Sequence, residues 1–275
     1  MSDLAAIVLA AGGGTRMHSS LPKVLHRLAG RPMIDHVLAT LEQLGVTDLV
    51  VVTGAGADQV ESILGGRVAT VRQEPQRGTA DAATAGLQSI SASARQVLVT
   101  MGDVPLLPAA LLEDLADAQA ADQRTVLSLL SARMADPAGY GRVVRGADGS
   151  LLRIVEESDA DAATRALDEV NAGTYCFDAA WLRANLGRVP LSPSGEHYLT
   201  DLIGLAVADG QLVRVVEAPQ PEMALGINDR VQLATAERLL RRRIAQGHML
   251  RGVTIVDPDT TFIDAAVEIG QDARI

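Results

Sequence analysis

Short apolar runs without polar alternation constrain the fold of this chain more than any other feature of its sequence. Such runs are typical of strands that are buried on both faces, as in parallel sheets. Several of the runs stop at or just before a glycine, where the chain can turn into a loop. The runs that we predict to be buried strands are Ala5–Ala10, Leu49–Val52, Val68–Val71 and Val97–Met101.

Segments with helical spacing separate these runs. Met33–Leu44 carries apolar residues three and four positions apart and is followed by Gly45, a typical end of a helix. Thr79–Ile90 is rich in alanine and is also predicted to be helical. Alternation of strand and helix is typical of βαβ units, so the first half predicts an α/β fold with helices on both faces of an open sheet.

The second half has a different pattern, which predicts a mixed rather than a purely parallel sheet. Two short apolar segments around a turn with Gly149 read as an antiparallel hairpin. Further elements are two strands and two helices. The hairpin and these elements are Arg142–Arg145 with Leu151–Val155, Val126–Leu130, Val170–Phe177, Tyr198–Ala208 and Val231–Ile244.

The last residues follow a third pattern. Ile263, Ile269 and Ile275 recur every six residues, which is the period of a hexapeptide β-helix. Stacked repeats need about three or more units before they bury a shared core. We therefore expect the tail to be the start of a β-helix cut short, with Ile263, Val267, Ile269 and Ile275 lacking packing partners.

Composition narrows the classes of function. Lys and Arg number 24 against 34 Asp and Glu, which gives a formal net charge of −10. Such a chain is a poor general binder of nucleic acid, whose attraction is mostly phosphate electrostatics. The single cysteine excludes an intrachain disulfide, and no apolar run approaches the roughly 20 residues of a membrane span. No signal peptide is recognisable at the start, so we expect a cytoplasmic protein without membrane or nucleic-acid partners.

The loop after the first predicted strand has the composition of a phosphate-binding turn. It contains three consecutive glycines, whose backbone N–H groups can approach a polyphosphate. It lacks the Gly-Lys pair of a P-loop, and Met17 stands where the dinucleotide fingerprint needs its last glycine. Arg16 and Lys23 follow the loop and can neutralise a triphosphate. The alternative is a loose turn with solvated charges.

Asp103 follows the strand Val97–Met101 directly. Ligands in open α/β sheets bind beyond the carboxyl ends of strands, so a carboxylate there is well placed to hold a divalent metal. Mg²⁺ commonly takes one or two protein oxygens together with waters and substrate phosphates. The alternative is an aspartate that only terminates a strand.

Nine segments in one order make the sequence similar to a known family. With them, nearly the whole chain resembles the bifunctional N-acetylglucosamine-1-phosphate uridyltransferases / glucosamine-1-phosphate acetyltransferases. The first and fourth segments are shared by many sugar nucleotidyltransferases, whereas the later ones are specific to this family. The segments are Leu9–Met17, Leu21–His26, Gln73–Ala80, Gly102–Leu106, Gly139–Arg142, Ile154–Glu156, Val170–Gly173, Glu196–Asp201 and Gly226–Arg230.

The resemblance implies a role for each matching residue. Arg16 and Lys23 would be the catalytic cations that face the phosphates, and Asp103 and Asn228 would coordinate Mg²⁺. The implied contacts of the nucleotide are Leu9, Ala11, Gly12, Lys23, Gln73, Gly78, Thr79 and Gly102. The implied contacts of the N-acetylhexosamine and its phosphate are Gly141, Glu156, Asn171, Tyr198, Thr200 and Asn228.

The implied reaction is Mg²⁺-dependent transfer of a uridylyl group from UTP to N-acetylglucosamine 1-phosphate, which serves peptidoglycan and lipopolysaccharide synthesis. The implied architecture is a Rossmann-like nucleotidyltransferase domain over 1–227, a linker helix over 228–248 and the stub of a left-handed β-helix over 249–275. The acetyltransferase half is essentially absent from this chain. Full-length members are expected to be homotrimers, whereas this chain is expected to be a monomer.

Two departures from the family bear on this reading. Gly13 stands where the family usually has lysine, which removes a cation from the triphosphate side, and Met101 stands where it usually has tyrosine. Other functions stay open at this point. A nucleotidyltransferase for another sugar 1-phosphate would keep the fold, and a dinucleotide-binding oxidoreductase is disfavoured by Met17. A non-catalytic nucleotide-binding module would be favoured by loss of Asp103 or Asn228, and both residues are present.

Overall fold

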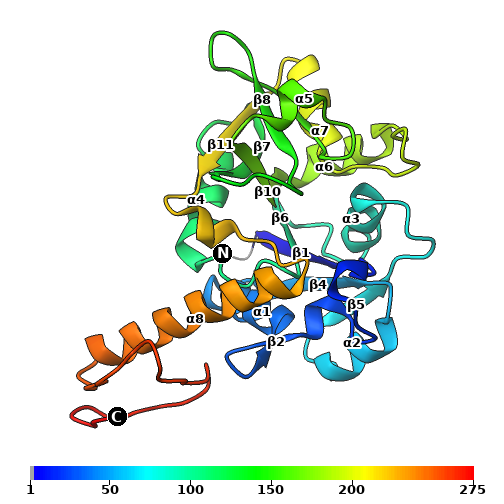
Figure 1. Cartoon of the computed structure of the whole chain (residues 1–275). Coiled ribbons are helices and arrows are strands. Elements are labelled where there is room, and N and C mark those ends of the chain that lie inside the picture. The colour runs from blue at the N-terminus through cyan, green and yellow to red at the C-terminus, as the bar shows by residue number, and fades with distance from the viewer. Residues whose placement is uncertain (1–2) are drawn as a thin grey trace.

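A computed structural model describes residues 3–275 and has a twisted nine-stranded sheet at its centre (Figure 1). Every neighbouring pair on the main path is parallel except the two pairs made by β10, which runs antiparallel to both neighbours. This confirms the predicted α/β fold with a mixed, mainly parallel sheet. The main path is β11 (Leu212–Glu217), β7 (Thr125–Arg133), β10 (Glu169–Asp178), β6 (Gln96–Met101), β1 (Leu4–Ala10), β4 (Asp48–Thr53) and β5 (Ala69–Arg72).

Smaller strands lie off this path. β8 (Arg142–Arg145) and β9 (Leu151–Val155) form the predicted antiparallel hairpin, and β8 also pairs with β10. β2 (Arg27–Leu28) and β3 (Arg31–Pro32) form a separate two-stranded sheet. The predicted buried strand Val68–Val71 corresponds to β5, but this prediction is wrong in burial. β5 is the edge of the sheet, and three of its four side chains are exposed.

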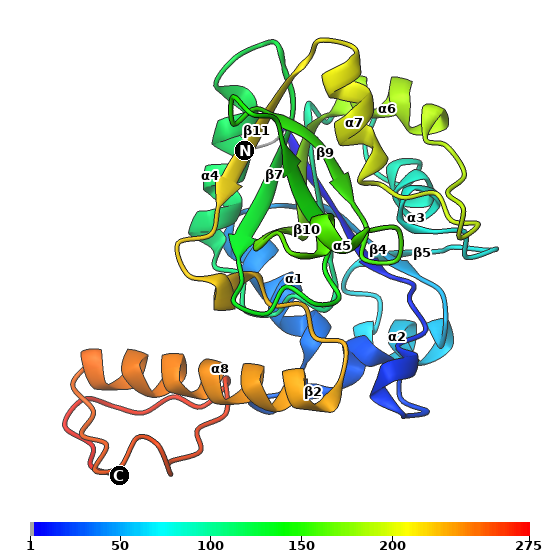
Figure 2. The ribbon, with the colours of Figure 1, turned by 45° about the horizontal axis from the view of Figure 1, so that its top comes forward.

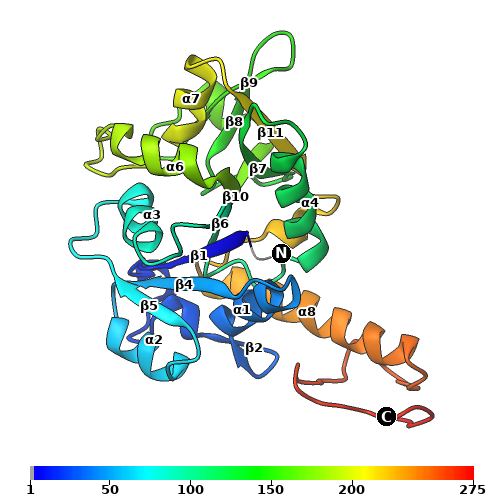
Figure 3. The ribbon, with the colours of Figure 1, turned by 180° about the vertical axis from the view of Figure 1, so that it is seen from behind.

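Strand β1 explains why an uninterrupted apolar run is needed. Its alternate residues enter two different cores, with Ala6 and Val8 on one face and Ala5 and Ile7 on the other. The first core is completed by α1 (Met33–Gln43), α2 (Ala57–Leu64) and α4 (Ala109–Ala120). The second core is completed by α3 (Thr79–Leu87), α6 (Ala179–Asn185) and α7 (Asp201–Ala208). Figure 3 shows α2 and α3 on opposite sides of β1 and β4.

The remaining helical segments are mostly short. They are α5 (Ala162–Arg165) and the 3₁₀ turns η1 (Thr15–Met17), η2 (Lys23–Leu25), η3 (Leu186–Arg188) and η4 (Pro221–Ala224). The exception is α8 (Arg230–Leu250), which leads away from the sheet (Figure 2). Within the described residues, no helix is both long and apolar enough to cross a bilayer.

The tail after α8 turns back and lies beside that helix (Figures 1 and 2). A parallel bridge joins Thr254 to Arg274, which is a single rung of strand-like pairing. Ile263 is buried and Ile269 packs partly against the same small cluster, which includes Ala245 of α8. The expectation that these two isoleucines lack partners is therefore wrong, whereas Val267 and Ile275 are exposed as expected.

Candidate functional site

Two adjoining cavities open at the carboxyl ends of β1 and β6. The first, of about 320 Å³, is lined by the loop after β1 and by residues from the β5–α3 connection, and we call it the glycine-loop half. The second, of about 180 Å³, is lined by residues that follow β9 and lie in β10, and we call it the strand half. Thr79, Met101 and Asp103 line both, so the two halves form one cleft.

The glycine loop reaches its position through close backbone contacts. Ala11 accepts a hydrogen bond from the Ala55 N–H at 3.1 Å, which ties the loop to the end of β4. Gly14 has a φ of +58°, and a Cβ there would lie 2.7 Å from the Cβ of Lys23. The third glycine is therefore required for both conformation and space. Gly12 and Gly13 do not meet such crowding, so their backbone faces the cavity freely.

The β5–α3 connection closes the other side of the glycine-loop half. Gln73 is buried and donates from Nε2 to the Gly78 carbonyl at 2.8 Å. Gly78 has a φ of +108°, and a Cβ there would lie 2.5 Å from the His197 carbonyl oxygen. Thr79 Oγ1 accepts from the Leu199 N–H at 2.9 Å. These contacts hold the connection against the segment that precedes α7.

Lys23, Asp103 and Asn228 meet where the two halves join. The Lys23 ammonium forms an ion pair with Asp103 and donates to Asn228 Oδ1 at 2.9 Å. The segments that carry the two acceptors are tied together, because the Ile227 N–H donates to the Asp103 carbonyl at 2.9 Å. Asn228 is held further by its backbone N–H, which donates to Gln232 Oε1 at 2.7 Å.

This acceptor pair fits a divalent cation of the Mg²⁺ type. One carboxylate and one amide oxygen converge on a single cation, the Lys23 ammonium, which marks the point where a metal would sit. The described residues include no group of three or more His, Cys, Asp and Glu side chains that could hold a metal. Two protein oxygens are nevertheless enough for Mg²⁺ when substrate phosphates and water complete its shell.

Glu156 supplies a partly buried carboxylate to the strand half. It accepts from Thr200 Oγ1 at 2.8 Å, and Thr200 is itself buried at the start of α7. Burial raises the pKa of Glu156, and the neighbouring carboxylate of Asp201 adds to the shift. The adjacent Glu157 turns away and pairs with the buried Arg142 at 2.9 Å. Only one carboxylate of the Glu156-Glu157 pair thus lines the cleft.

Asn171 reaches the strand half through an irregularity in β10. The register of β10 against β7 shifts between Asn171 and Tyr175, and Gly173 within this shift has a φ of +70°. Asn171 donates from Nδ2 to the Tyr175 hydroxyl at 2.6 Å. Its backbone N–H donates to the Gly141 carbonyl at 2.8 Å, which places Gly141 beside it in the lining.

Most of the predicted site residues line the cleft, and three do not. Arg16 is exposed on η1, with its guanidinium 3.6 Å from the position that a Cβ on Gly139 would take. Gly102 lies behind the lining, where its N–H donates to the Leu9 carbonyl at 2.9 Å. Tyr198 directs its hydroxyl to Ser194 Oγ at 2.7 Å. Their roles stay predictions. The predicted residues that line the cleft are Leu9, Ala11, Gly12, Lys23, Gln73, Gly78, Thr79, Asp103, Gly141, Glu156, Asn171, Thr200 and Asn228.

Sequence reasoning missed several lining residues, among them the four that follow. Gln76 and Glu196 belong to the glycine-loop half, and Tyr140 and Gly226 belong to the strand half. The Tyr140 hydroxyl accepts from the Gly226 N–H at 3.1 Å and lies 3.3 Å from the Gly226 carbonyl, so it joins the two segments across the cleft. All four lie in segments that carry the family resemblance. Of the four, Tyr140 carries the clearest sequence signal of a site residue, because a large side chain between Gly139 and Gly141 suggests a specific contact.

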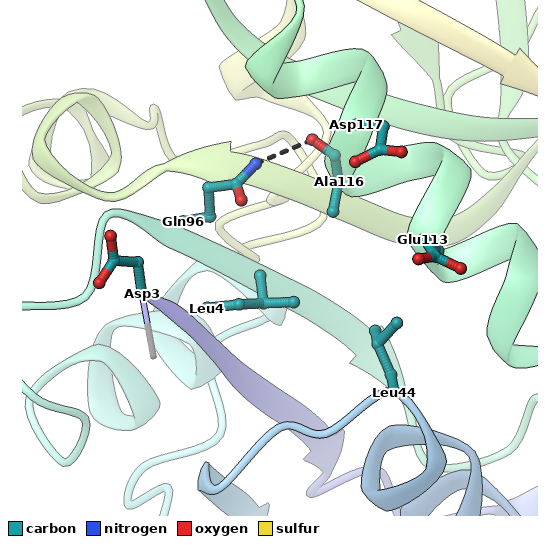
Figure 4. A pocket seen from close by; sticks show the side chains of 7 residues that line it. All are labelled: Asp3, Leu4, Leu44, Gln96, Glu113, Ala116 and Asp117. Atoms are coloured by element: carbon teal, nitrogen blue, oxygen red, sulfur yellow. Dashed lines mark hydrogen bonds between the residues drawn. The ribbon is translucent and has the colours of Figure 1, made fainter. Parts of the chain in front are cut away.

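A further cavity of about 300 Å³ lies at the opposite edge of the sheet, near the amino ends of β1 and β6 (Figure 4). The acidic side chains Asp3, Glu113 and Asp117 line it, and Gln96 donates to the Ala116 carbonyl at 2.8 Å. Ligands of open α/β sheets bind at the carboxyl ends of strands. The cleft is therefore the stronger candidate for the functional site.

Comparison with known proteins identifies similar sequences and a similar fold. The family model for the MobA-like NTP transferase domain matches residues 6–171, a stretch that includes the glycine loop, Asp103 and Asn171. Among curated relatives, "Bifunctional protein GlmU" of Trichlorobacter lovleyi is 45% identical over 278 residues, which covers 100% of this chain and 60% of that protein. The protein of the same name from Mycolicibacterium gilvum is 46% identical over 287 residues, with 100% and 57% covered.

The chain thus spans about 60% of the length of these relatives. Among solved structures, a putative glucose-1-phosphate thymidylyltransferase from Bacillus anthracis, crystallised with sucrose, superposes with a TM-score of 0.67. The alignment covers 86% of this chain and 95% of the other at 20% identity. At that level of identity the likeness concerns the fold.

Proposed function

The chain belongs to the family of MobA-like NTP transferase domains, and from this premise we propose that it makes UDP-N-acetylglucosamine. The reaction is transfer of a uridylyl group from UTP to N-acetylglucosamine 1-phosphate, with release of pyrophosphate. The observation that carries the proposal is the convergence of Lys23, Asp103 and Asn228 where the two halves of the cleft meet. Similarity to the curated GlmU proteins over the whole chain supports the choice of substrates.

We assign the nucleotide to the glycine-loop half. Backbone groups of Leu9, Ala11 and Gly12 together with the side chain of Gln73 would contact the base, and the cavity is lined by all four. The phosphates would then run toward Lys23, the cation at the inner end of this half. Arg16, exposed on η1, would balance the outer phosphates.

We assign the N-acetylated sugar to the strand half. Glu156 can accept hydrogen bonds from sugar hydroxyls, and the amide of Asn171 can recognise the acetamido group. Asn171 is buried and Glu156 is partly buried, so an analogue that leaves their polar groups unpaired is expected to be rejected strongly. The 1-phosphate would point toward the junction of the two halves, where Lys23 and a cation held by Asp103 and Asn228 would balance its charge.

The chemistry needs no general base. Phosphate monoesters have a second pKa of about 6, so the sugar phosphate is mostly dianionic at neutral pH. One of its oxygens attacks the α-phosphorus of UTP in line. The new P–O bond forms as the bond to the bridging oxygen breaks, and pyrophosphate leaves with that electron pair. The protein's contribution is to hold the two reactants in line and to balance charge with Lys23 and Arg16.

The proposed reaction includes Mg²⁺ as a cofactor. Asp103 and Asn228 would hold it, and they fit because their oxygens already converge on one cation. A bound divalent cation would supply charge neutralisation to the phosphates between which the transfer takes place. We also propose a cytoplasmic location, where nucleoside triphosphates are available.

The test is a substrate panel. The purified protein is incubated with Mg²⁺, each common nucleoside triphosphate and each of several sugar 1-phosphates, and pyrophosphate release is measured. We expect UTP with N-acetylglucosamine 1-phosphate to be the preferred pair by a wide margin in kcat/KM. Equal use of glucose 1-phosphate would instead support a nucleotidyltransferase of broader sugar choice, and no pyrophosphate with any pair would refute the proposal.

We further propose that the residues needed for this transfer all precede α8, because every residue that lines the cleft does.

A further inference from the structure

Lys23 is the only lysine in the chain, whereas arginine occurs throughout it. This one ammonium forms an ion pair with Asp103 and donates to Asn228 Oδ1 at 2.9 Å. The two acceptors are the pair to which the proposed function assigns the metal. Arginine is a planar fork, but a compact ammonium with three rotatable donors can take the place of a metal ion between two oxygens. A lysine therefore suits the space between these two oxygens better than an arginine, and this is the one position at which the chain has a lysine.

We propose that Lys23 is an internal counter-cation of the metal site, which occupies the point between Asp103 and Asn228 in the free protein and competes with the divalent cation for it. Binding of the divalent cation then releases the ammonium into the glycine-loop half. This inference rests on the proposed function for the identity of the metal-ligand pair and for the place of the triphosphate. It adds that the free protein binds divalent cations weakly because of one of its own side chains.

The two acceptors are more firmly held than the lysine. The Asp103 carbonyl accepts from the Ile227 N–H at 2.9 Å, and the Asn228 N–H donates to Gln232 at 2.7 Å. Lys23 instead carries its charge on a flexible four-carbon stem. Two cations cannot share the space between the acceptors, because they would repel each other strongly at such short distances. The part that moves on metal binding is therefore the lysine side chain.

The released ammonium has a place to go. Lys23 lines the glycine-loop half, on the side where the proposed function puts the triphosphate. The side chains of Lys23 and Asp103 are only 14% and 16% exposed, so a site without any cation would leave a poorly hydrated carboxylate. Lysine prevents this in the free protein. A cation that arrives with its nucleotide replaces the lysine and at the same time frees it for the phosphates.

The first experiment measures Mn²⁺ binding by the full chain without substrates, from the electron paramagnetic resonance signal of free Mn²⁺. Lys23→Met removes the competitor, so we expect affinity at the site to rise by about tenfold or more. Arg16→Met is the matched control, because it removes the same charge nearby without touching the pair. We expect it to change the affinity by less than about threefold. In the double variant Lys23→Met, Asp103→Ala, the gain should disappear.

The second experiment uses the wild-type protein and is independent of how the variants fold. Protein labelled with ¹³C at the lysine ε-carbon has one lysine signal, which belongs to Lys23. Titration with Mg²⁺ alone should shift and sharpen this signal as the ammonium leaves its two acceptors. A signal that does not respond to saturating Mg²⁺ would overturn the proposal. So would Lys23→Met protein, folded by circular dichroism, that binds Mn²⁺ no more tightly than Arg16→Met. A failure of the proposed function would appear separately, as absence of pyrophosphate release by the wild type.

Discussion

The glycine-loop half and the strand half of the cleft present their polar groups by different means. The glycine-loop half relies on backbone, in a loop that follows β1 and turns through a left-handed glycine at Gly14. The strand half relies on side chains. Asn171 and Thr200 are buried, Glu156 is partly buried, and each is hydrogen-bonded to a neighbour. Backbone groups remain when a side chain is changed. The strand half should therefore be the more sensitive of the two to single substitutions.

The largest effect is expected where the halves meet. Asp103→Ala should lower kcat by about a thousandfold, because an electrostatic contact to the reacting phosphates is lost from a site shared by both substrates. The fold should persist, since Asp103 follows β6 rather than packing in the core. Pyrophosphate release at saturating Mg²⁺ checks this, with circular dichroism as the control. Near-normal turnover by a folded variant would remove Asp103 from the site.

A smaller effect that is confined to one substrate is expected in the strand half. Asn171→Ala should lower kcat/KM for N-acetylglucosamine 1-phosphate by about tenfold to a hundredfold, the cost of one lost hydrogen bond in a buried site. The KM for UTP should not change, because Asn171 does not line the glycine-loop half. Steady-state kinetics with each substrate varied in turn separates the two. Equal losses of kcat/KM for UTP and for the sugar phosphate would mean that the two halves do not bind their substrates independently.

The strand half also predicts an effect on the stability of the protein, through the carboxylate of Glu156. Its pKa is raised by burial, so its ionised form costs stability at any pH above the unfolded-state pKa of 4.5. Glu156→Gln removes that cost while its side-chain oxygen can still accept from Thr200. The free energy of unfolding should therefore rise at pH 7, and the gain should fade as the pH falls through the raised pKa of Glu156 and be absent below 4.5. Denaturant unfolding at both pH values measures it.

Protonation of Glu156 at low pH removes a cost in stability, but it should weaken binding of the sugar phosphate. As the pH falls through the raised pKa of Glu156, the protonated carboxyl loses capacity to accept from a sugar hydroxyl. The KM for the sugar phosphate should then increase in the wild type more than in Glu156→Gln, which serves as the control for titration of the substrate's own phosphate. A variant that is both destabilised at pH 7 and unchanged in KM would contradict the assignment.

The contrast between the halves also explains how much of the site could be predicted. The glycine loop and Lys23 follow from local pattern, because an apolar run, three glycines and the lysine lie close together in the sequence, whereas Gln73, Gly78 and Thr79 of the same half came from the resemblance. The strand half does not follow from local pattern, since Glu156 and Asn171 are single polar residues that come together only through the hairpin β8–β9 and the irregular stretch of β10. Family resemblance was needed to find them. Tyr140 was missed because its partner, Gly226, is 86 residues away.

The same distinction applies to the fold. Strands that are buried on both faces, such as β1 and β6, were predicted because burial removes polar residues from them. The helix α2 and the strand β11 were not predicted, because both are partly exposed and interleave charged residues. In the tail, a period of six residues was visible. The burial of Ile263 was not, because its partners include Ala245 on α8.

The smallest effect is expected when a positively charged side chain is added to the glycine-loop half. Gly13 has ordinary backbone geometry, and a Cβ there would meet only Ala55 at 3.9 Å, so a longer side chain fits without strain. Gly13→Lys should lower the KM for UTP by about threefold, the size expected for an exposed charge pair, and should leave the KM for the sugar phosphate unchanged. The gain should shrink as salt is added. Gly14→Ala is the matched control, because its Cβ would collide with Lys23 and its φ is +58°, so it should weaken UTP binding. An unchanged KM for UTP at low salt would mean that the triphosphate does not pass over this loop, and the backbone account of the glycine-loop half would then be wrong.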